Sequence, residues 1–415
     1  MISYLRKHSG KIIFLLLYLS LFIGFYLNET ASGGGTRADF YLTWQYVLNL
    51  KEDLFFHYTH WEAIHLPFHY IIVSIINSFL EDKNQIRFFY CVISILIPIL
   101  FYLSLKIKFP KINNNLLLVF ASALFILPTF RYTAIWANVQ VTAHIFFLFS
   151  IFFYLKWKEK KINTFDKNLI FQILFMTLAT YTRQDYAIFY LFFMIIYLQK
   201  INFKMFLLLS IFVLFLSLPG FWFVYEQSTV LSHIKFSSNF QNYLLVNSSI
   251  MSFYLIPIIF YFLIYEQQKI KQDAKFISIT LILFSILTFI FSYSFDYDYK
   301  IGGGFILKLS MILFNNFLIF YISSVVGFVA LTYLARNDIN NFIIIILLLF
   351  GYSSSMIFQK YFEPTFIFVF FLLMQSQISF NFLKNYKNVL LIYIYFCIYL
   401  ASAITNDLFQ LTKQI

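Results

Sequence analysis

One carboxylate of this sequence lies close to an apolar block and beside a glycine-rich linker. Asp39 follows the first apolar block, comes after the run Gly33 to Gly35 and begins an amphipathic stretch. A carboxylate at the edge of a bilayer can take the proton from a sugar hydroxyl that attacks a lipid-linked donor, which is general-base catalysis. The alternative role for such a residue is a solvated helix N-cap. The residue type and its position alone leave both roles open for Asp39.

Four of the seven histidines gather between His57 and His69, in the same polar stretch as Glu62. His65 and His69 have the i, i+4 spacing that lets two imidazoles share a helix face and a metal ion. Neither an HExxH motif nor a pair of acids accompanies them, so we expect no metal site. Polar residues that line a sugar cleft at the interface fit the pattern better. We predict that Glu62, His65 and His69 contact the substrate.

A third set of polar residues, Arg183, Gln184 and Asp185, lies between two apolar blocks with almost no loop. Ionisable side chains at membrane depth are costly and indicate a functional site by default. The planar guanidinium of Arg183 suits a phosphate, and the Gln184 amide adds donors beside it. The alternative is an Arg183–Asp185 ion pair that caps a tight turn. We predict that Arg183 and Gln184 bind a donor phosphate and that Asp185 contacts the substrate.

Two later segments add weaker candidates. Lys360 can pair with a second phosphate oxygen or merely extend along the apolar surface to water, and Tyr361 beside it is predicted to contact the substrate. Asp296 and Asp298 have DxD spacing, but a two-residue pattern alone favours a solvated loop. The glycine run at 302–304 lets the backbone approach a ligand closely.

The elements that position these residues follow from the composition. Of 415 residues, 61% are hydrophobic and 12% are charged, whereas a soluble domain carries about 25% charged residues. The apolar blocks match the roughly 20 residues that a helix needs to cross a bilayer. Backbone groups in lipid must bond within their own segment, so the blocks are helices, and the alternation typical of membrane barrels is missing. We predict an all-α polytopic membrane protein with a single transmembrane domain over residues 1–415.

We predict thirteen spanning helices and a cytoplasmic N-terminus. The spans are 11–27, 86–105, 114–130, 139–155, 168–182, 185–199, 203–222, 249–265, 276–293, 311–334, 341–358, 364–379 and 388–404. The cytoplasmic turns then hold 19 of the 30 lysines and arginines, as the positive-inside rule requires. The net charge of +12 is therefore topogenic, and we expect no nucleic-acid partner. Arg131 and Asn138, at external span ends, are weak site candidates.

The segment Leu66–Leu80 is apolar but short, and it begins with Pro67 after a polar stretch. If this segment crossed the membrane, the basic turn after residue 105 would lie outside. We therefore predict that the segment lies at the outer interface or dips into it. Residues 28–85 then form one large external loop with interfacial helices.

Together these features resemble the GT-C superfamily of membrane glycosyltransferases. Its members carry an acid soon after the first span, then interfacial helices, and they take sugar from a polyprenyl-phosphate donor. Asp39, in Arg-Ala-Asp-Phe-Tyr, occupies the acid position, and His65-Leu-Pro-Phe-His-Tyr70 resembles the start of the interfacial helix. The resemblance implies an inverting transferase with Asp39 as base. Polyprenyl phosphate is a good leaving group at neutral pH, so neither a divalent metal nor another cofactor is expected.

Within that superfamily, the chain is similar to the α-1,2-glucosyltransferase that completes the lipid-linked oligosaccharide. That family has an Arg-Gln pair opening a span, as in Arg183-Gln184, and a glycine-rich external loop like 302–304. Its late Arg-Tyr-Tyr-x-x-Pro-like stretch is comparable to Lys360-Tyr-Phe-Glu-Pro364. The chain departs from that family in having Phe40 after the acid and Lys360 in place of Arg, which leaves the sugar and the linkage open.

The resemblance implies a membrane glycosyltransferase that moves a sugar from a polyprenyl-phosphate donor to a glycan or lipid-linked acceptor, with membrane lipid around it. The abundance of Phe, Ile, Asn and Lys suggests an AT-rich genome and therefore a bacterial inner membrane, with the site facing the periplasm. Two alternatives stay open. An O-antigen-type polysaccharide polymerase would also be polytopic, and a lipid or solute transporter belongs to another class.

Overall fold

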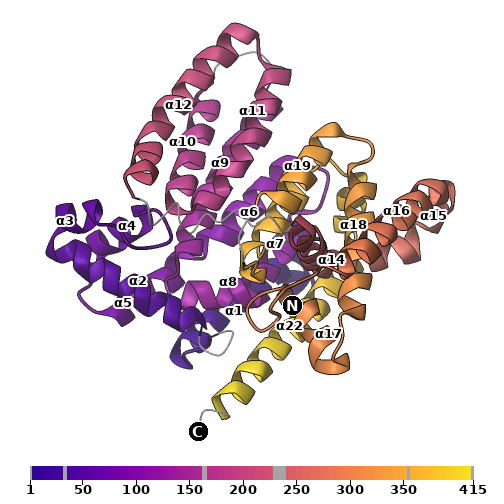
Figure 1. Ribbon diagram of the computed structural model, residues 1–415, viewed down its shortest axis with the longest axis horizontal. Coiled ribbons are helices and arrows are strands. Elements are labelled where there is room, and N and C mark those ends of the chain that lie inside the picture. The colour runs from indigo at the N-terminus through magenta and orange to yellow at the C-terminus, as the bar shows by residue number, and fades with distance from the viewer. Residues whose placement is uncertain (1, 31–34, 161–165, 228–239, 353–355, 413–415) are drawn as a thin grey trace. The chain divides into compact units, whose positions relative to one another are not determined.

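The computed structural model describes residues 2–30, 35–160, 166–227, 240–352 and 356–412. Within these ranges every regular element is a helix (Figure 1). The chain forms two compact units: unit 1 comprises Met1–His233 and Val389–Ile415, and unit 2 comprises Ile234–Asn388. The prediction of an all-helical protein is confirmed for the described ranges.

Unit 1 carries the first external loop and the Arg183 segment. Its helices are α1 (Ile2–Tyr26), α2 (Gly35–Glu52), α3 (Leu54–Thr59), α4 (Phe68–Asn77), α5 (Lys83–Ile93), α6 (Leu96–Lys108), α7 (Asn114–Ser122), η1 (Ala123–Ile126), α8 (Pro128–Ile135), α9 (Val139–Glu159), α10 (Lys167–Thr182), η2 (Gln184–Ala187), α11 (Ile188–Lys200), α12 (Phe203–Glu226) and most of α22 (Tyr386–Thr412).

Helix α9 packs along α10 through a ladder of phenylalanine rings. Phe149 and Phe153, about one helical turn apart on α9, both stack on Phe175 of α10, with ring centroids 4.8 and 5.6 Å away. Side chains at this spacing share one helix face, and offset aromatic pairs add to the free energy gained by burial. The α9–α10 pair thereby fixes the C-terminal end of α10, where Arg183 follows.

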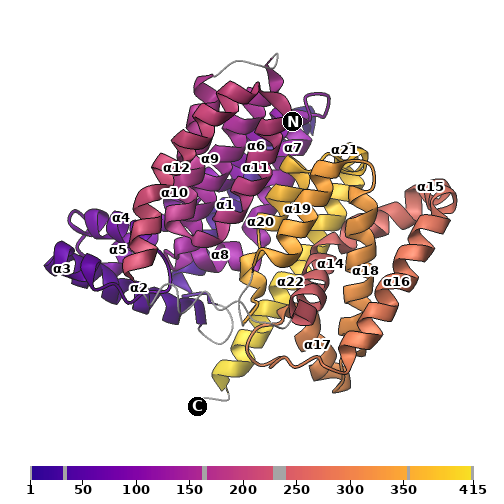
Figure 2. The same cartoon turned by 45° about the horizontal axis from the view of Figure 1, so that its top comes forward.

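Helices α2, α3 and α4 lie across one end of α10 and α12 (Figure 2). Helix α2 buries Phe40, Thr43, Val47 and Leu50, which lie on one face, and leaves the opposite face exposed. Helix α4 has 10 residues, or about 15 Å of length at the α-helical rise, and cannot cross an apolar core of about 30 Å. Its bounds agree with an interfacial position for the segment predicted from Leu66 to Leu80.

The third predicted span is broken. The helical stretches Asn114–Ile126 and Pro128–Ile135 meet at an angle of 68°. Pro128 has no amide hydrogen, and its ring disfavours the helical conformation for the preceding residue. Leu127 is accordingly extended, with φ −74° and ψ 123°. Next to the break, the Phe125 carbonyl oxygen accepts a hydrogen bond from Arg131 Nη1 at 3.1 Å.

In the part of the chain that the structure describes, eight helices are long and apolar enough to cross a membrane, or up to ten if each of two bent pairs counts as one span. They are Ser9–Tyr26, Lys83–Lys108, Val139–Glu159, Phe203–Glu226, Phe240–Tyr265, Ala274–Ser292, Leu318–Ala335 and Tyr386–Asp407. The chain is therefore an integral, multi-pass membrane protein. Thirteen spans stay a prediction, because predicted spans 168–182 and 185–199 coincide with α10 and α11, which have only 16 and 13 residues.

Unit 2 comprises α14 (Phe240–Tyr265), α15 (Gln267–Gln272), α16 (Ala274–Ser292), α17 (Gly304–Phe314), α18 (Leu318–Ala335), α19 (Ile339–Phe350), η3 (Gln359–Tyr361), α20 (Thr365–Phe368), η4 (Val369–Leu373) and α21 (Gln377–Leu383). Small residues bring α14 and α18 together, as is common in membrane helix pairs. A Cβ atom at Gly327 would lie 2.1 Å from the Ser248 carbonyl oxygen. The hydroxyls of Ser249 and Ser323 bond across the same interface at 2.7 Å.

Candidate functional site

The Arg183 turn joins α10 to η2 and touches the first external loop. Arg183 adopts extended backbone angles that end α10, and it is 3% exposed. Its Nη2 is ion-paired with Asp185 Oδ2, which is the alternative foreseen from the sequence. Gln184 Nε2 donates to the Ile64 carbonyl oxygen at 3.0 Å. The turn is therefore tied to the segment that leads into α4, and phosphate binding by Arg183 and Gln184 stays a prediction.

The charges of Asp39 and Arg183 shift the pKa of one phenol, that of Tyr70 on α4, in opposite directions. Burial raises the pKa of Tyr70, and the charges of Tyr46 and Asp39 raise it further. A hydrogen bond between Thr43 and this phenol and the charge of Arg183 lower the pKa of Tyr70. Thr43 lies one turn after Asp39 on α2, and its hydroxyl donates to the Asp39 carbonyl oxygen at 2.9 Å. Unit 1 thus brings the predicted base and the predicted phosphate ligand within electrostatic reach of Tyr70.

Glu62 and His65 lie in the segment between α3 and α4. Glu62 is exposed, and His65 is half-buried. The His65 carbonyl oxygen accepts a hydrogen bond from Trp61 Nε1 at 2.8 Å, and the Trp61 ring packs against Tyr70 with centroids 5.0 Å apart. These contacts connect His65 to Tyr70 through the Trp61 ring, and the substrate roles of Glu62 and His65 stay predictions.

His69 lies in the interior. It is fully buried, and its Nδ1 is 2.9 Å from the Thr142 hydroxyl of α9. The Tyr90 hydroxyl is 3.1 Å from the same Thr142 oxygen. Burial lowers the pKa of His69 to about 3, and the neighbouring His65 lowers it in the same sense. His69 is therefore neutral at physiological pH and joins α4, α5 and α9.

An apolar groove runs between α10 and α12. Its volume is about 870 Å³. It is lined by Tyr58, Phe171, Leu174, Phe175, Thr177, Leu178, Tyr181, Phe215, Leu216, Leu218, Pro219 and Trp222. A second cavity of about 120 Å³ shares Tyr58, Tyr181 and Pro219 with the groove and reaches Leu66 and Pro67. The apolar space therefore extends to the segment before α4 whose Ile64 carbonyl Gln184 contacts. Tyr181, which lines both the groove and the cavity, lies two residues before Arg183.

Tyr181 inserts into the backbone ladder of α12. Pro219 lies inside this helix and cannot donate a hydrogen bond. The Tyr181 hydroxyl donates to the Leu216 carbonyl oxygen and accepts from the Gly220 amide at 3.2 Å. These two backbone groups would bond each other in a regular helix. The Tyr181 hydroxyl thus bridges the two ends of one missing backbone hydrogen bond of α12 and links α10 to α12, the two walls of the groove.

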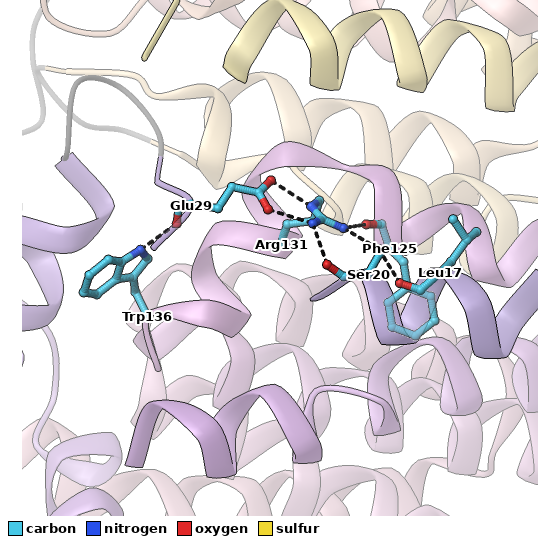
Figure 3. A network of polar contacts seen from close by, with 6 residues as sticks. All are labelled: Leu17, Ser20, Glu29, Phe125, Arg131 and Trp136. Atoms are coloured by element: carbon cyan, nitrogen blue, oxygen red, sulfur yellow. Dashed lines mark hydrogen bonds and ion pairs between the residues drawn. The ribbon is translucent and has the colours of Figure 1, made fainter. Parts of the chain in front are cut away.

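A buried ion pair holds the end of α1 against the broken span (Figure 3). Arg131 Nε and Nη2 donate to Glu29 Oε1 and Oε2 at 2.9 and 2.7 Å. Its remaining hydrogens bond the Ser20 hydroxyl, the Ser20 carbonyl and the Phe125 carbonyl at 2.8 to 3.1 Å. Trp136 Nε1 donates to the Glu29 carbonyl oxygen at 2.8 Å. All five N–H groups of Arg131 are used, so this arginine has a structural role.

A second cation reinforces the same end of α1. The Arg87 guanidinium lies 3.7 Å from the centroid of the Trp136 ring and donates to the Asn28 side-chain oxygen at 3.0 Å. The sequence had marked Arg131 only as a weak candidate and had not marked Glu29 or Arg87. Their partners lie far away along the chain, so no local spacing indicated them.

Lys360 and Tyr361 belong to unit 2, in η3. Gln359 beside them donates to the Tyr254 hydroxyl at 3.1 Å, and this hydroxyl donates to Glu363 Oε2 at 2.7 Å. Glu363 is fully buried, and although it stands in the stretch Lys360-Tyr-Phe-Glu-Pro364, no role was predicted for it from the sequence. The Lys360 ammonium lies 5.3 Å from the centroid of the Phe358 ring. The phosphate role of Lys360 and the substrate role of Tyr361 stay predictions.

Among the described residues, no three His, Cys, Asp or Glu side chains come together as a metal site. Comparison with protein families, curated proteins and solved structures finds no match to this chain.

Proposed function

We propose that this membrane protein is a glycosyltransferase that moves a sugar from a polyprenyl-phosphate donor to a glycan or lipid-linked acceptor. The observation that carries the proposal is the apolar groove between α10 and α12, whose lining residue Tyr181 lies two residues before Arg183. The smaller cavity that shares Tyr181 with this groove reaches Leu66. A long isoprenoid chain needs an apolar groove, and its phosphate needs a cation at the end of that groove.

The shape and chemistry of the groove support a chain-like ligand. All but one of its lining side chains are apolar or aromatic, and the exception, Thr177, turns its hydroxyl to the Ile173 carbonyl oxygen at 2.9 Å. Only 11% of the residues in the most apolar stretch of α12 are buried, so this wall of the groove faces the lipid. A lipid chain can therefore enter sideways from the bilayer.

The proposed reaction is an inverting displacement. The Asp39 carboxylate takes the proton from the acceptor hydroxyl, and that oxygen forms a bond to the anomeric carbon. The bond from this carbon to the phosphate oxygen breaks, and the phosphate leaves with the electron pair. Arg183 and Gln184 stabilise the developing negative charge. Tyr70, which responds to the charges of both Asp39 and Arg183, supports their action at one centre.

The Arg183–Asp185 pair sets a condition on this reaction. Arg183 Nη2 is occupied by Asp185, which is itself partly exposed. A donor phosphate presents the same planar pair of oxygens as a carboxylate, so it can take over the guanidinium while Asp185 turns to solvent or to the sugar. In this account Asp185 holds the arginine in place until the donor arrives.

The proposal includes the predicted topology: thirteen spans, a cytoplasmic N-terminus and an external loop over 28–85, in a bacterial inner membrane with the site facing the periplasm. The distribution of basic residues supports this orientation. Single cysteines at Lys51 and Lys271 should react with impermeant maleimide from opposite sides of the membrane. Labelling of both positions from one side would contradict the topology.

The test of the function begins with the lipid phosphate part of the donor. Purified protein in nanodiscs is titrated with undecaprenyl phosphate and, separately, with undecaprenol, which lacks the phosphate. Leu178→Trp fills the groove, and Leu191→Trp adds the same ring to a lipid-facing position that is 60% exposed. We expect the phosphate to bind more tightly than the alcohol, and Leu178→Trp to weaken binding about tenfold, equivalent to about 1.4 kcal/mol. Equal binding of both lipids, or equal effects of both tryptophans, would overturn the proposal.

A further inference from the structure

Unit 2 contains a second apolar groove. Its volume is about 190 Å³, and its walls come from α14, α15, α16, α18 and α21. Ile270 of α15, Ile277 of α16 and Leu334 of α18 line it, together with Ala330. Every lining residue is apolar except Tyr333, whose hydroxyl donates to Asp273 Oδ2 at 2.8 Å. The polar edge of the groove therefore lies where α15 meets α16.

A layer of ion pairs surrounds this edge. Arg336 Nη1 lies 2.6 Å from Asp273 Oδ2, and the guanidinium stacks on the Tyr333 ring at 4.1 Å from its centroid. Lys269 Nζ lies 2.8 Å from Glu266 Oε2. Both acids are therefore neutralised by neighbouring cations.

Two lysines remain beyond these pairs. Lys271 and Lys275 are exposed, and in the described part of the chain neither lies within ion-pair distance of an acid. Lys271 belongs to α15 and Lys275 to α16, on either side of Asp273, which forms the polar edge of the groove. With Lys269 and Arg336, they make four basic residues at the junction of α15 and α16, where the polar edge of the groove lies.

We propose that this groove binds an anionic phospholipid, with an acyl chain among the apolar walls and the phosphate beside Lys271 and Lys275. Four basic side chains next to the end of a membrane helix match an anionic lipid head group. A zwitterionic lipid brings its own cation and gains less from the two lysines. The topogenic role of these charges accounts for their side of the membrane, but it does not account for the apolar groove beside them. This proposal is independent of the donor site in unit 1.

The test compares two kinds of variant in the full-length protein. Lys271→Gln/Lys275→Gln removes the two charges beside the groove, and Lys156→Gln/Lys158→Gln removes two charges from the last turn of α9, which does not line this groove. Ala330→Phe fills the groove, and Ile322→Phe enlarges a lipid-facing position of the same helix that is 54% exposed. Protein purified from nanodiscs with equal phosphatidylglycerol and phosphatidylcholine is analysed by native mass spectrometry for retained lipid.

We expect wild-type protein and both controls to retain phosphatidylglycerol in preference to phosphatidylcholine. Each lysine near an anionic surface contributes about fivefold, so the double glutamine variant should lose about 30-fold of the preference. Ala330→Phe should lose the retained lipid although its charges are intact. Equal loss in both lysine pairs would show non-specific attraction to the membrane surface and overturn the proposal. Unchanged retention in Ala330→Phe would also overturn it.

Discussion

Gly220 of α12 lies directly against the ring of Tyr181 of α10: a Cβ atom at Gly220 would be 2.5 Å from Tyr181 Cε1. The Gly220 amide also donates to the Tyr181 hydroxyl. Glycine is required here for close approach, since any side chain would push the two helices apart. This contact sets the distance between α10 and α12, the walls of the groove that we assign to the lipid donor. Tyr181 itself lies two residues before Arg183.

Gly220→Ala should therefore destabilise the protein and weaken binding of undecaprenyl phosphate. Gly220 and Tyr181 are both half-buried, and overpacking of such a tight contact costs about 1–3 kcal/mol. The same substitution in a Tyr181→Ala background should cost much less, because the opposing ring is absent. Thermal unfolding of the four proteins measures the coupling. Equal costs in both backgrounds would show that the contact is unimportant.

Glu29→Gln should destabilise unit 1 by about 3 kcal/mol, since removal of one partner leaves the buried Arg131 charge uncompensated. Glu81→Gln, which changes an exposed carboxylate between α4 and α5, serves as the control. The apparent melting temperature of each variant in detergent gives the comparison. Indistinguishable melting of the two variants would contradict the structural role assigned to the Glu29–Arg131 pair.

Three variants separate the two roles considered for Arg183. Arg183→Lys should weaken binding of undecaprenyl phosphate because an ammonium cannot reproduce the planar pair of hydrogen bonds, and Arg183→Ala should weaken it more. Asp185→Asn should keep binding, because the donor phosphate replaces this carboxylate in our account. If the pair were only structural, Asp185→Asn and Arg183→Ala would lower thermal stability equally and leave binding unchanged.

The buried, neutral His69 makes stability depend on pH. Its pKa is about 3 in the folded protein and about 6.5 when unfolded, so the unfolded chain binds the extra proton between these values. The contribution of His69 is complete above pH 6.5 and is lost as pH falls below it, by up to about 1.4 kcal/mol per pH unit. His69→Gln should make the melting temperature depend less on pH between pH 6.5 and pH 4.5 than it does in wild type. Parallel curves would show that His69 is solvated.

Part of the fold could be read from the sequence because hydropathy and local turn chemistry are short-range signals. Apolar blocks predicted helices, and the length of Leu66–Leu80 with Pro67 at its start predicted a non-spanning segment, which agrees with the ten-residue α4. The Arg183–Asp185 pair was foreseen as an alternative because both residues lie in one tight turn. The number of membrane spans was harder to predict, because single residues can end a helix inside an apolar block. Asn315, in the left-handed conformation with φ 49°, separates α17 from α18 in this way.

Contacts between distant helices left no such signal. Glu29 and Arg131 are separated by 102 positions, and Tyr181 and Gly220 by 39, so neither pair forms a motif. Each contact depends on the angle and register at which two helices pack, and hydropathy does not encode these. Glu363 was equally hidden, since its hydroxyl partner Tyr254 lies on α14, 109 positions away.

The central claim is most directly tested by sugar transfer itself. Inverted membrane vesicles would place the site inside, so right-side-out vesicles with wild-type protein are given polyprenyl-phosphate donors that carry radiolabelled hexoses. Asp39→Asn is compared with wild type and with Glu52→Gln, which alters an exposed acid of the same helix. We predict that wild type and Glu52→Gln transfer label to an endogenous glycan or lipid-linked acceptor and that Asp39→Asn, with unchanged melting temperature, is about 10²- to 10⁴-fold slower. Full-rate transfer by Asp39→Asn, or binding of every donor by wild type without any transfer, would contradict the account.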